Sequence, residues 1–158
     1  MTEQANTGFI DDYMTYLLAR ASHVMSTAFH HEVRAAGLSV MEWRVLASLS
    51  GRPPQGIGAL ADAVLAQQPT LTKLVSRMAE QGLVQRLAHE GDRRQTLVAL
   101  SARGQKLVAP LLVRARVNES HMLQDLNADE QAALKRQLRL LIARDSELGP
   151  HSAIDPAN

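Results

Sequence analysis

The chain of 158 residues contains no cysteine. This absence excludes a disulfide framework, a thiolate metal site and a cysteine-based redox switch. Long hydrophobic runs are also missing, because no stretch approaches the roughly 18 uninterrupted apolar residues of a membrane span. Residues 1–8 are polar and lack the basic and then apolar pattern of a signal peptide. We therefore expect a cytoplasmic protein without a membrane partner.

The sequence also lacks the motifs of the common enzyme classes. It has no phosphate-binding loop, no dinucleotide fingerprint and no zinc-hydrolase helix. Ser101 follows His89 and Asp92 in sequence, but no nucleophile elbow surrounds the serine. A predicted strand also separates it from the loop that carries the other two residues. We expect neither enzymatic activity nor a bound cofactor.

Six histidines raise the question of a metal ion. His30, His31 and Glu32 are adjacent rather than four residues apart, so they do not share a helix face. His121 and Asp125 are one helical turn apart and could supply two ligands, but a tetrahedral site needs more. We predict no metal site.

Isoleucine is scarce, whereas alanine and leucine are abundant. Four isoleucines stand against 23 alanines and 23 leucines, which favours helices because β-branched residues lose side-chain freedom there. Apolar spacing and turn residues predict helices over 10–37, 40–49, 57–64, 69–81, 102–126 and 128–148, and strands over 83–88 and 95–100. Capping boxes at Ser39–Glu42 and Asn127–Glu130 open two of these helices, and Pro110 is expected to kink another. The run GRPPQG at 51–56 is predicted to be a loop.

This order of elements describes a winged helix-turn-helix. The predicted fold class is therefore mostly α (α+β), with three central helices followed by a two-stranded β-wing. The winged helix-turn-helix DNA-binding region covers residues 38–100. The helices within 10–37 and 101–148 form a second layer, which we interpret as a dimerisation region. Residues 1–9 and 149–158 are expected to be flexible tails.

Positive charge is concentrated in the middle of the chain. Between Gln68 and Lys106, seven Lys and Arg residues stand against three acidic residues, a balance of +4, whereas the rest of the chain has a balance of −3. A localised positive field is suited to a nucleic acid. Charge alone leaves open that this segment is an ordinary solvated face.

Several short patterns occur in order between Gly37 and Gly104. They are Gly37-Leu38-Ser39-x-x-Glu42-Trp43-x-Val45-Leu46, Leu60-Ala61, Pro69-Thr70-Leu71-Thr72-Lys73-Leu74-Val75-x-Arg77-Met78, Gly82-Leu83-Val84-x-Arg86, and Asp92-Arg93-Arg94 followed by Val98-x-Leu100-Ser101-x-x-Gly104. In order and spacing they resemble the MarR family of bacterial transcription regulators. Ser101 and Lys73 stand where Thr and Arg are commoner in that family. The resemblance implies a sequence-specific, dimeric transcriptional repressor, with activation in place of repression left open.

The helix predicted over 69–81 presents polar side chains opposite its apolar side. Short polar side chains at a helix start allow deep entry into a major groove, and longer basic side chains reach phosphates or a guanine edge. The resemblance places six residues at the DNA: Gln68, Pro69, Thr70, Thr72, Lys73 and Arg77. Which of them read bases stays open, as does the alternative of a plain solvated helix face.

The tip of the predicted hairpin carries Asp92, Arg93 and Arg94. Asp92 and Arg94 are two residues apart, so on an extended segment the carboxylate can hold the guanidinium in one rotamer. An oriented arginine on a narrow protrusion suits a narrow, A·T-rich minor groove. The resemblance implies this role for Asp92 and Arg94, with Arg93 at the DNA backbone. The alternative is a surface ion pair of little energetic weight.

The first predicted helix carries an apolar seam of heptad type. Its members are Ile10, Met14, Leu17, Ala21, Val24 and Ala28. Because three central helices cannot cover this seam, it predicts a twofold homodimer. Such a dimer reads a palindromic operator in double-stranded DNA, with half-sites roughly 34–36 Å apart. A monomer that folds these helices back on itself is the alternative.

A polar stripe runs along the same helix beside the seam. Members of the resembling family bind small aromatic carboxylates or phenols near the junction of their two layers. The resemblance makes five residues candidates for such an effector site: Tyr16, Arg20, His23, Trp43 and Arg44. Arg20 would hold a carboxylate, His23 a ring hydroxyl or ring nitrogen, and Trp43 would form an apolar wall, with Arg44 as a second anion partner. Alternatively, the stripe is solvated or forms salt bridges between subunits, and Trp43 belongs to the core.

A helical adaptor that binds only protein is the alternative to a DNA-binding regulator. Such an adaptor would need neither the basic segment nor the tip with Asp92 and Arg94. A steep loss of DNA binding with rising salt distinguishes the two classes.

Overall fold

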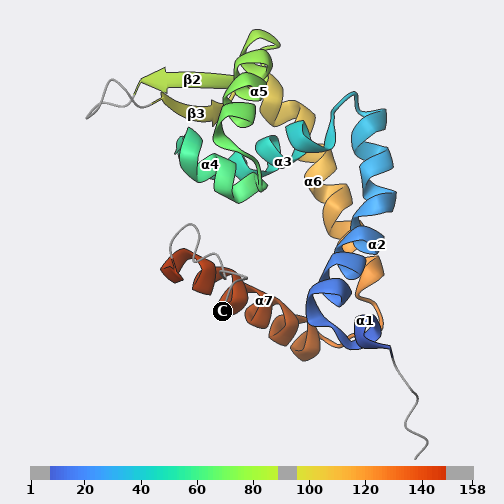
Figure 1. Cartoon of the computed structure of the whole chain (residues 1–158). Helices are drawn as coiled ribbons and strands as arrows, with labels where there is room; N and C mark the ends of the chain where they lie inside the picture. The colour runs from blue at the N-terminus through green and yellow to red at the C-terminus, as the bar shows by residue number, and fades with distance from the viewer. Residues whose placement is uncertain (1–7, 89–95, 149–158) are drawn as a thin grey trace, which may run out of the picture. The chain divides into compact units, whose positions relative to one another are not determined.

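The computed structural model describes residues 8–88 and 96–148, the last four of these by their backbone alone. Its elements are α1 (Phe9–Asp12), α2 (Met14–Ala35), α3 (Val40–Leu49), β1 (Gln55–Gly56), α4 (Ile57–Val64), α5 (Gln68–Glu80), β2 (Val84–Ala88), β3 (Thr96–Leu100), α6 (Ala102–Met122) and α7 (Ala128–Leu148) (Figure 1). This is the predicted mostly helical winged helix-turn-helix. No helix in the described ranges is long and apolar enough to cross a bilayer.

The chain divides into two compact units, with the boundary between Asn118 and Glu119 inside α6. The first unit contains α1 to α5, the sheet and most of α6. Within it, α2 and α6 are connected by an ion pair between Glu32 and Arg114. The Asn118 side chain also donates to the Met25 carbonyl at 2.9 Å. The second unit contains the end of α6 and all of α7.

The N-terminal helix is interrupted at Tyr13, so the prediction of one continuous helix from residue 10 was wrong. Tyr13 has extended backbone angles (φ −77°, ψ 112°) and serves as the N-cap of α2. Its carbonyl accepts from the N–H groups of Tyr16 and Leu17 at 2.9 and 3.1 Å. The ring of Tyr13 stacks on that of Phe9 with centroids 5.0 Å apart, which holds α1 against the start of α2.

Both predicted capping boxes are present. At the start of α3, the Ser39 Oγ accepts from the Glu42 N–H at 3.2 Å, and the Glu42 Oε2 accepts from the Ser39 N–H at 2.8 Å. At the start of α7, Asn127 and Glu130 make the same reciprocal pair at 3.0 and 2.8 Å. The preceding helix α6 includes Pro110 and ends at Met122, four residues earlier than expected.

The sheet has three antiparallel strands in the order β1-β3-β2. The predicted hairpin of β2 and β3 is confirmed, with Val84 opposite Leu100 and Ala88 opposite Thr96. The short strand β1 was missed, because residues 51–56 were predicted to be only a loop. Its two residues pair with Val98 and Leu97 of β3, a partner more than 40 positions away that local turn residues cannot reveal.

One apolar core supports the winged helix-turn-helix. Its fully buried side chains come from α2 to α6 and from β3: Val33, Val45, Leu46, Leu60, Val64, Leu71, Val75, Met78, Val98 and Val108. Four of its residues, Leu71, Leu74, Val75 and Met78, form the buried side of α5. The core therefore fixes which side of α5 faces away from the protein.

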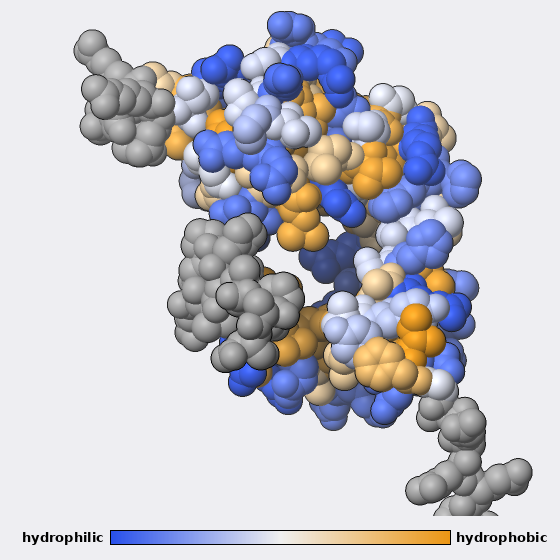
Figure 2. Space-filling view, viewed as in Figure 1, coloured by the Kyte–Doolittle hydropathy of each residue, from blue (hydrophilic) through white to orange (hydrophobic). Residues whose placement is uncertain are grey.

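The predicted apolar seam on the first helices is exposed in the single chain. Every member from Ile10 to Ala28 is exposed, and the larger side chains include Ile10 at 51%, Met14 at 61% and Val24 at 53%. Figure 2 shows hydrophobic side chains gathered at the surface over α1 and the start of α2. Among the described residues of the first unit, no element covers this seam.

Candidate nucleic-acid interface

Helix α5 separates its apolar and polar residues cleanly. Leu71, Leu74, Val75 and Met78 are buried. The six residues predicted to contact DNA are all exposed: Gln68, Pro69, Thr70, Thr72, Lys73 and Arg77. The structure therefore brings them to one outward side of a helix whose other side is held by the core.

The start of α5 has no side-chain cap. It begins after the N-cap Gln67 with Pro69 in its first turn, no capping hydrogen bond and no acidic residue in that turn. The preceding turn contains Leu65 in the left-handed region (φ 58°), which redirects the chain out of α4. The first N–H groups of a helix carry partial positive charge and lack intrahelical acceptors. This end of α5 is therefore electrostatically suited to an anion.

A groove of about 580 Å³ lies between α5 and the sheet. Its lining includes Gln68 and Thr72 of α5, Arg86 of β2 and Thr96 of β3. The Thr72 hydroxyl donates to the Gln68 carbonyl at 2.9 Å, which fixes its side chain on the helix. Arg86 was not among the predicted contact residues, although it belongs to the basic segment. Its place on the strand that follows α5 was the available signal.

The N-terminal end of α6 is hydrogen-bonded to the segment that joins α5 to β2. The three backbone carbonyls of residues 81–83 accept hydrogen bonds from Ser101 and Arg103. The Arg103 Nη1 donates to Gln81 at 2.9 Å, the Ser101 hydroxyl to Gly82 at 2.5 Å and the Ser101 N–H to Leu83 at 3.2 Å. The relative positions of α5 and the wing are therefore fixed by α6.

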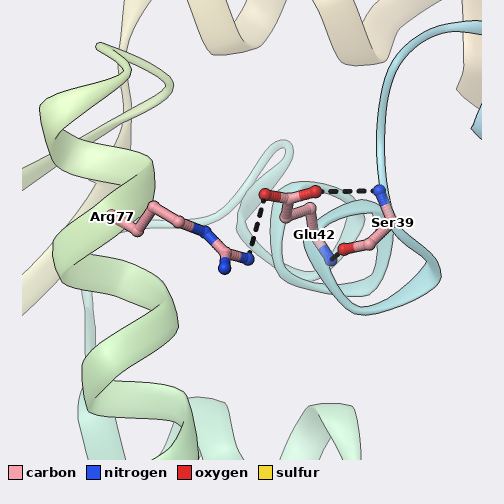
Figure 3. Close-up of polar contacts among 3 residues, drawn as sticks. All are labelled: Ser39, Glu42 and Arg77. Atoms are coloured by element: carbon pink, nitrogen blue, oxygen red, sulfur yellow. Dashed lines mark hydrogen bonds and ion pairs between the residues drawn. The ribbon is translucent and has the colours of Figure 1, made fainter.

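Arg77 contacts Glu42 of α3, 35 positions earlier (Figure 3). Its Nη2 lies 3.4 Å from the Glu42 Oε1, with 58% of the arginine side chain exposed and 9% of the glutamate side chain. Burial alone would raise the pKa of Glu42, but the hydrogen bonds from Ser39 and the guanidinium of Arg77 together lower it below the usual value. Glu42 is therefore ionised at neutral pH.

The wing-tip residues Asp92, Arg93 and Arg94 lie outside the described residues. Their minor-groove and backbone roles stay predictions. The strands that lead to the tip are described, and β2 and β3 keep a continuous antiparallel register from Val84 to Ala88. A hairpin therefore extends toward the segment that carries these residues.

Basic side chains gather where α2 meets α3. Burial and the nearby groups Arg34, Arg44 and His23 lower the pKa of His30. Arg44, from α3, and His23, from α2, were predicted effector residues, and both act electrostatically on His30. Positive charges held around a neutral imidazole can attract an anion.

The other predicted effector residues lie on both helices. The Trp43 ring packs edge-on against Phe29 of α2 with centroids 4.9 Å apart, and it borders the core. The Arg20 guanidinium lies 5.9 Å from the centre of the Tyr16 ring on the same helix. Three pockets among the described residues of the first unit are lined by other residues.

No group of three or more His, Cys, Asp or Glu side chains in the described part of the chain is arranged to hold a metal ion.

The described features define a winged helix-turn-helix protein. Comparison with known proteins shows to which family of winged helix-turn-helix proteins the chain belongs. The MarR family model matches residues 38–96. The MarR family regulator SPO1453 from Silicibacter pomeroyi DSS-3 is 40% identical in sequence, with a TM-score of 0.75 over 87% of this chain and 98% of that one. The chain belongs to the MarR family, whose members are transcription regulators rather than enzymes.

Two further known proteins are similar to most of the chain. The homoprotocatechuate degradative operon repressor of Escherichia coli is 28% identical over 138 residues, which cover 87% of this chain and 90% of the repressor. The structure of NadR in complex with 4-hydroxyphenylacetate shares the fold, with a TM-score of 0.78 and 23% identity over 90% of this chain and 98% of that one.

Proposed function

We propose that this protein is a cytoplasmic, sequence-specific transcriptional repressor. It binds a palindromic operator as a homodimer and is released by a small aromatic, anionic ligand. The proposal rests on the two sides of α5. Gln68, Thr72 and Lys73 are exposed on one side, whereas the apolar side chains of the other side are buried. This is the arrangement of a helix that enters the major groove.

Each half-site would be contacted by α5 and by the wing. Gln68, Pro69, Thr70 and Thr72 are short enough to approach base edges, and Lys73 reaches a phosphate or a guanine. Arg94, held by Asp92, would enter the minor groove, with Arg93 at the DNA backbone. Arg86 of β2 borders the same groove as Gln68 and Thr72, and we add it as a contact between these two sets.

Lys73→Ala and Arg94→Ala test the DNA contacts. Each substitution should weaken operator binding by roughly 5-fold to 150-fold, corresponding to about 1–3 kcal/mol, and leave the thermal unfolding temperature unchanged. Arg139→Ala, at an exposed position on α7, removes the same charge from a residue that is not in the predicted contact set, and it serves as the matched control. Equal operator affinities in all three variants would contradict the assignment.

The exposed seam supports the homodimer. Six apolar positions from Ile10 to Ala28 are exposed in the described part of the chain, and α6 adds the exposed Val113 and Val117. A second copy of the chain can cover both sets through one twofold axis, because each copy offers the same surface. Two copies of α5 then face successive turns of the DNA.

The effector is proposed to be a phenolic or N-heteroaromatic carboxylate. The positive charge of Arg44 near His30 supports a carboxylate partner, His23 can hydrogen-bond a ring hydroxyl or ring nitrogen, and Trp43 supports an aromatic ligand. Tyr16 and Arg20 lie on the same helix as His23 and complete the candidate set. The E. coli relative named for homoprotocatechuate degradation and the NadR complex with 4-hydroxyphenylacetate favour this class by analogy.

Isothermal titration with 4-hydroxyphenylacetate and 6-hydroxynicotinate tests this site. Arg44→Ala and Arg20→Ala should each weaken binding of the acid that the wild-type protein accepts, by roughly tenfold for a lost charge-assisted contact. Arg52→Ala, in the loop after α3, is the charge-matched control. Unaltered affinity in Arg44→Ala and Arg20→Ala would contradict the proposed ligand roles.

A further inference from the structure

Among the described side chains, one charged residue is buried, and it is Glu42. Both of its carboxylate oxygens are engaged. Oε2 accepts from the Ser39 N–H at 2.8 Å, and Oε1 lies 3.4 Å from Nη2 of Arg77. The carboxylate therefore belongs at once to the cap of α3 and to a contact with α5, as Figure 3 shows.

This contact joins two helices, and on the α3 side it is made by a carboxylate with little freedom. The capping box fixes the Glu42 side chain on α3, and a buried carboxylate with both oxygens hydrogen-bonded has one strongly preferred position. Arg77 lies in the last turn of α5, next to the fully buried Met78. A rotation of α5 about its own axis would carry Arg77 away from Glu42 and leave one carboxylate oxygen unpaired.

We propose that Arg77 is a positioning residue for DNA recognition, whose guanidinium holds the rotation of α5 through Glu42 instead of binding a phosphate. The inference rests on the proposed function, because it assumes that α5 enters the major groove. It changes the predicted role of Arg77 alone, and the other residues of α5 keep their proposed contacts with DNA. Specificity is the property that should depend on it, since a rotated helix presents Thr72 and Lys73 to the wrong base edges.

A direct phosphate contact makes a different prediction from a positioning role. A side chain that neutralises a phosphate contributes about 0.9 to the slope of log K against log salt concentration, whatever the DNA sequence. A positioning residue contributes nothing to that slope. Its loss weakens operator binding more than binding to unrelated DNA, because only the operator depends on correct placement of α5.

The test is a double-mutant cycle of Glu42→Gln and Arg77→Gln in the full chain. Binding to a labelled operator fragment and to an unrelated fragment of equal length is measured at several salt concentrations. Each single substitution should weaken operator binding roughly tenfold, and the double variant should be no weaker than either single variant. The salt slope and the affinity for unrelated DNA should match the wild type. Lys73→Gln is the control on the same helix, and its salt slope should fall.

Two results would overturn the inference. One is a salt slope lowered by about 0.9 in Arg77→Gln. The other is additivity of the two substitutions, which would show that Arg77 acts without Glu42. If the wild-type protein shows no preference for any operator fragment, the proposed function falls as well. A wild-type protein that binds its operator, together with either overturning result, removes the positioning role alone. Circular dichroism melts of all variants establish that each one is folded.

Discussion

At the scale of single residues, Glu42 shows how burial and hydrogen bonding compete. Its burial disfavours the charged form, yet the hydrogen bonds from Ser39 and the charge of Arg77 more than compensate, and the pKa is lowered. A lowered pKa in the folded state means that the ionised carboxylate stabilises the fold. This contribution is present above the unfolded-state pKa and is lost as the pH falls through the folded-state value.

The direction of the Glu42 pKa shift predicts how the stability of the Glu42→Gln variant depends on pH. At pH 7 the variant should be less stable than the wild type by about 1–3 kcal/mol, the usual cost of an unpaired buried polar group. The difference should shrink as the pH falls below about 4.5, the ordinary value at which the Glu42 carboxyl of the unfolded chain takes up a proton, and it should vanish below the lowered pKa of the folded state. Urea unfolding at pH 7, 5 and 3 measures it, with Glu80→Gln on the exposed surface of α5 as the control. A difference that stays constant over this range would contradict the account.

Single residues were predictable where their partners are close in sequence. The pairing of Ser39 with Glu42 follows from a spacing of three residues and is confirmed. The contact of Glu42 with Arg77 spans 35 positions and depends on how α3 packs against α5, so the spacing of residues could not reveal it. Arg86 follows α5 within the basic segment, which was a signal, but its place beside Gln68 and Thr72 depends on the sheet.

At the scale of elements, α6 crosses the joint between α5 and β2 at Gly104. The Gly104 N–H donates to the Ser101 Oγ at 2.9 Å, and the same hydroxyl donates to the Gly82 carbonyl. A β-carbon at Gly104 would overlap the carbonyl oxygen of Leu83, a backbone atom that cannot rotate away. Glycine is therefore required here by close approach, since α6 must lie near enough for these hydrogen bonds.

Gly104→Ala should destabilise the protein by about 1–3 kcal/mol, the range for an overpacked core position. The matched control is Gly58→Ala in α4, where an added β-carbon meets nothing within 4 Å. That change should be neutral or should stabilise the protein by up to about 1 kcal/mol, because alanine has the higher helix propensity. Chemical denaturation of both variants gives the comparison. A Gly104→Ala variant as stable as the wild type would show that α6 is not held this closely.

The order and type of the main elements could be predicted from the sequence, because caps, apolar spacing and turn residues are local signals. The recognition helix and the hairpin lie within a residue or two of their predicted bounds. Two features could not be predicted. The break at Tyr13 interrupts an otherwise continuous apolar spacing, and β1 exists only because Gln55 and Gly56 reach β3 across the fold.

At the scale of the whole molecule, the exposed seam on α1 and α2 is the strongest sign of a second chain. Side chains such as Ile10, Met14 and Val24 are more than half exposed. Each would contribute about 25 cal/mol per Å² of apolar surface on burial in an interface. An isolated chain leaves this apolar surface exposed to water, whereas a twofold dimer buries the seams of both chains.

Leu17→Asp in the seam should convert the dimer into a monomer, because it buries a charge in an apolar interface. Leu65→Asp is the control, since Leu65 is 84% exposed in the turn between α4 and α5 and lies outside the seam. Light scattering at micromolar concentration should give the mass of two chains for the wild type and for Leu65→Asp, and of one chain for Leu17→Asp. A wild-type mass of one chain would contradict the dimer.

The central claim is that this chain binds its own operator, and one titration tests it most directly. Labelled double-stranded DNA from the region upstream of the gene is titrated with wild-type protein at two salt concentrations, with and without 4-hydroxyphenylacetate. We expect binding tighter than to an unrelated fragment, weakened roughly a thousandfold or more between about 50 and 200 mM salt, as counterion release requires. The aromatic acid should release the DNA. Absence of preferential binding at either salt concentration would contradict the account and would favour a helical adaptor that binds only protein.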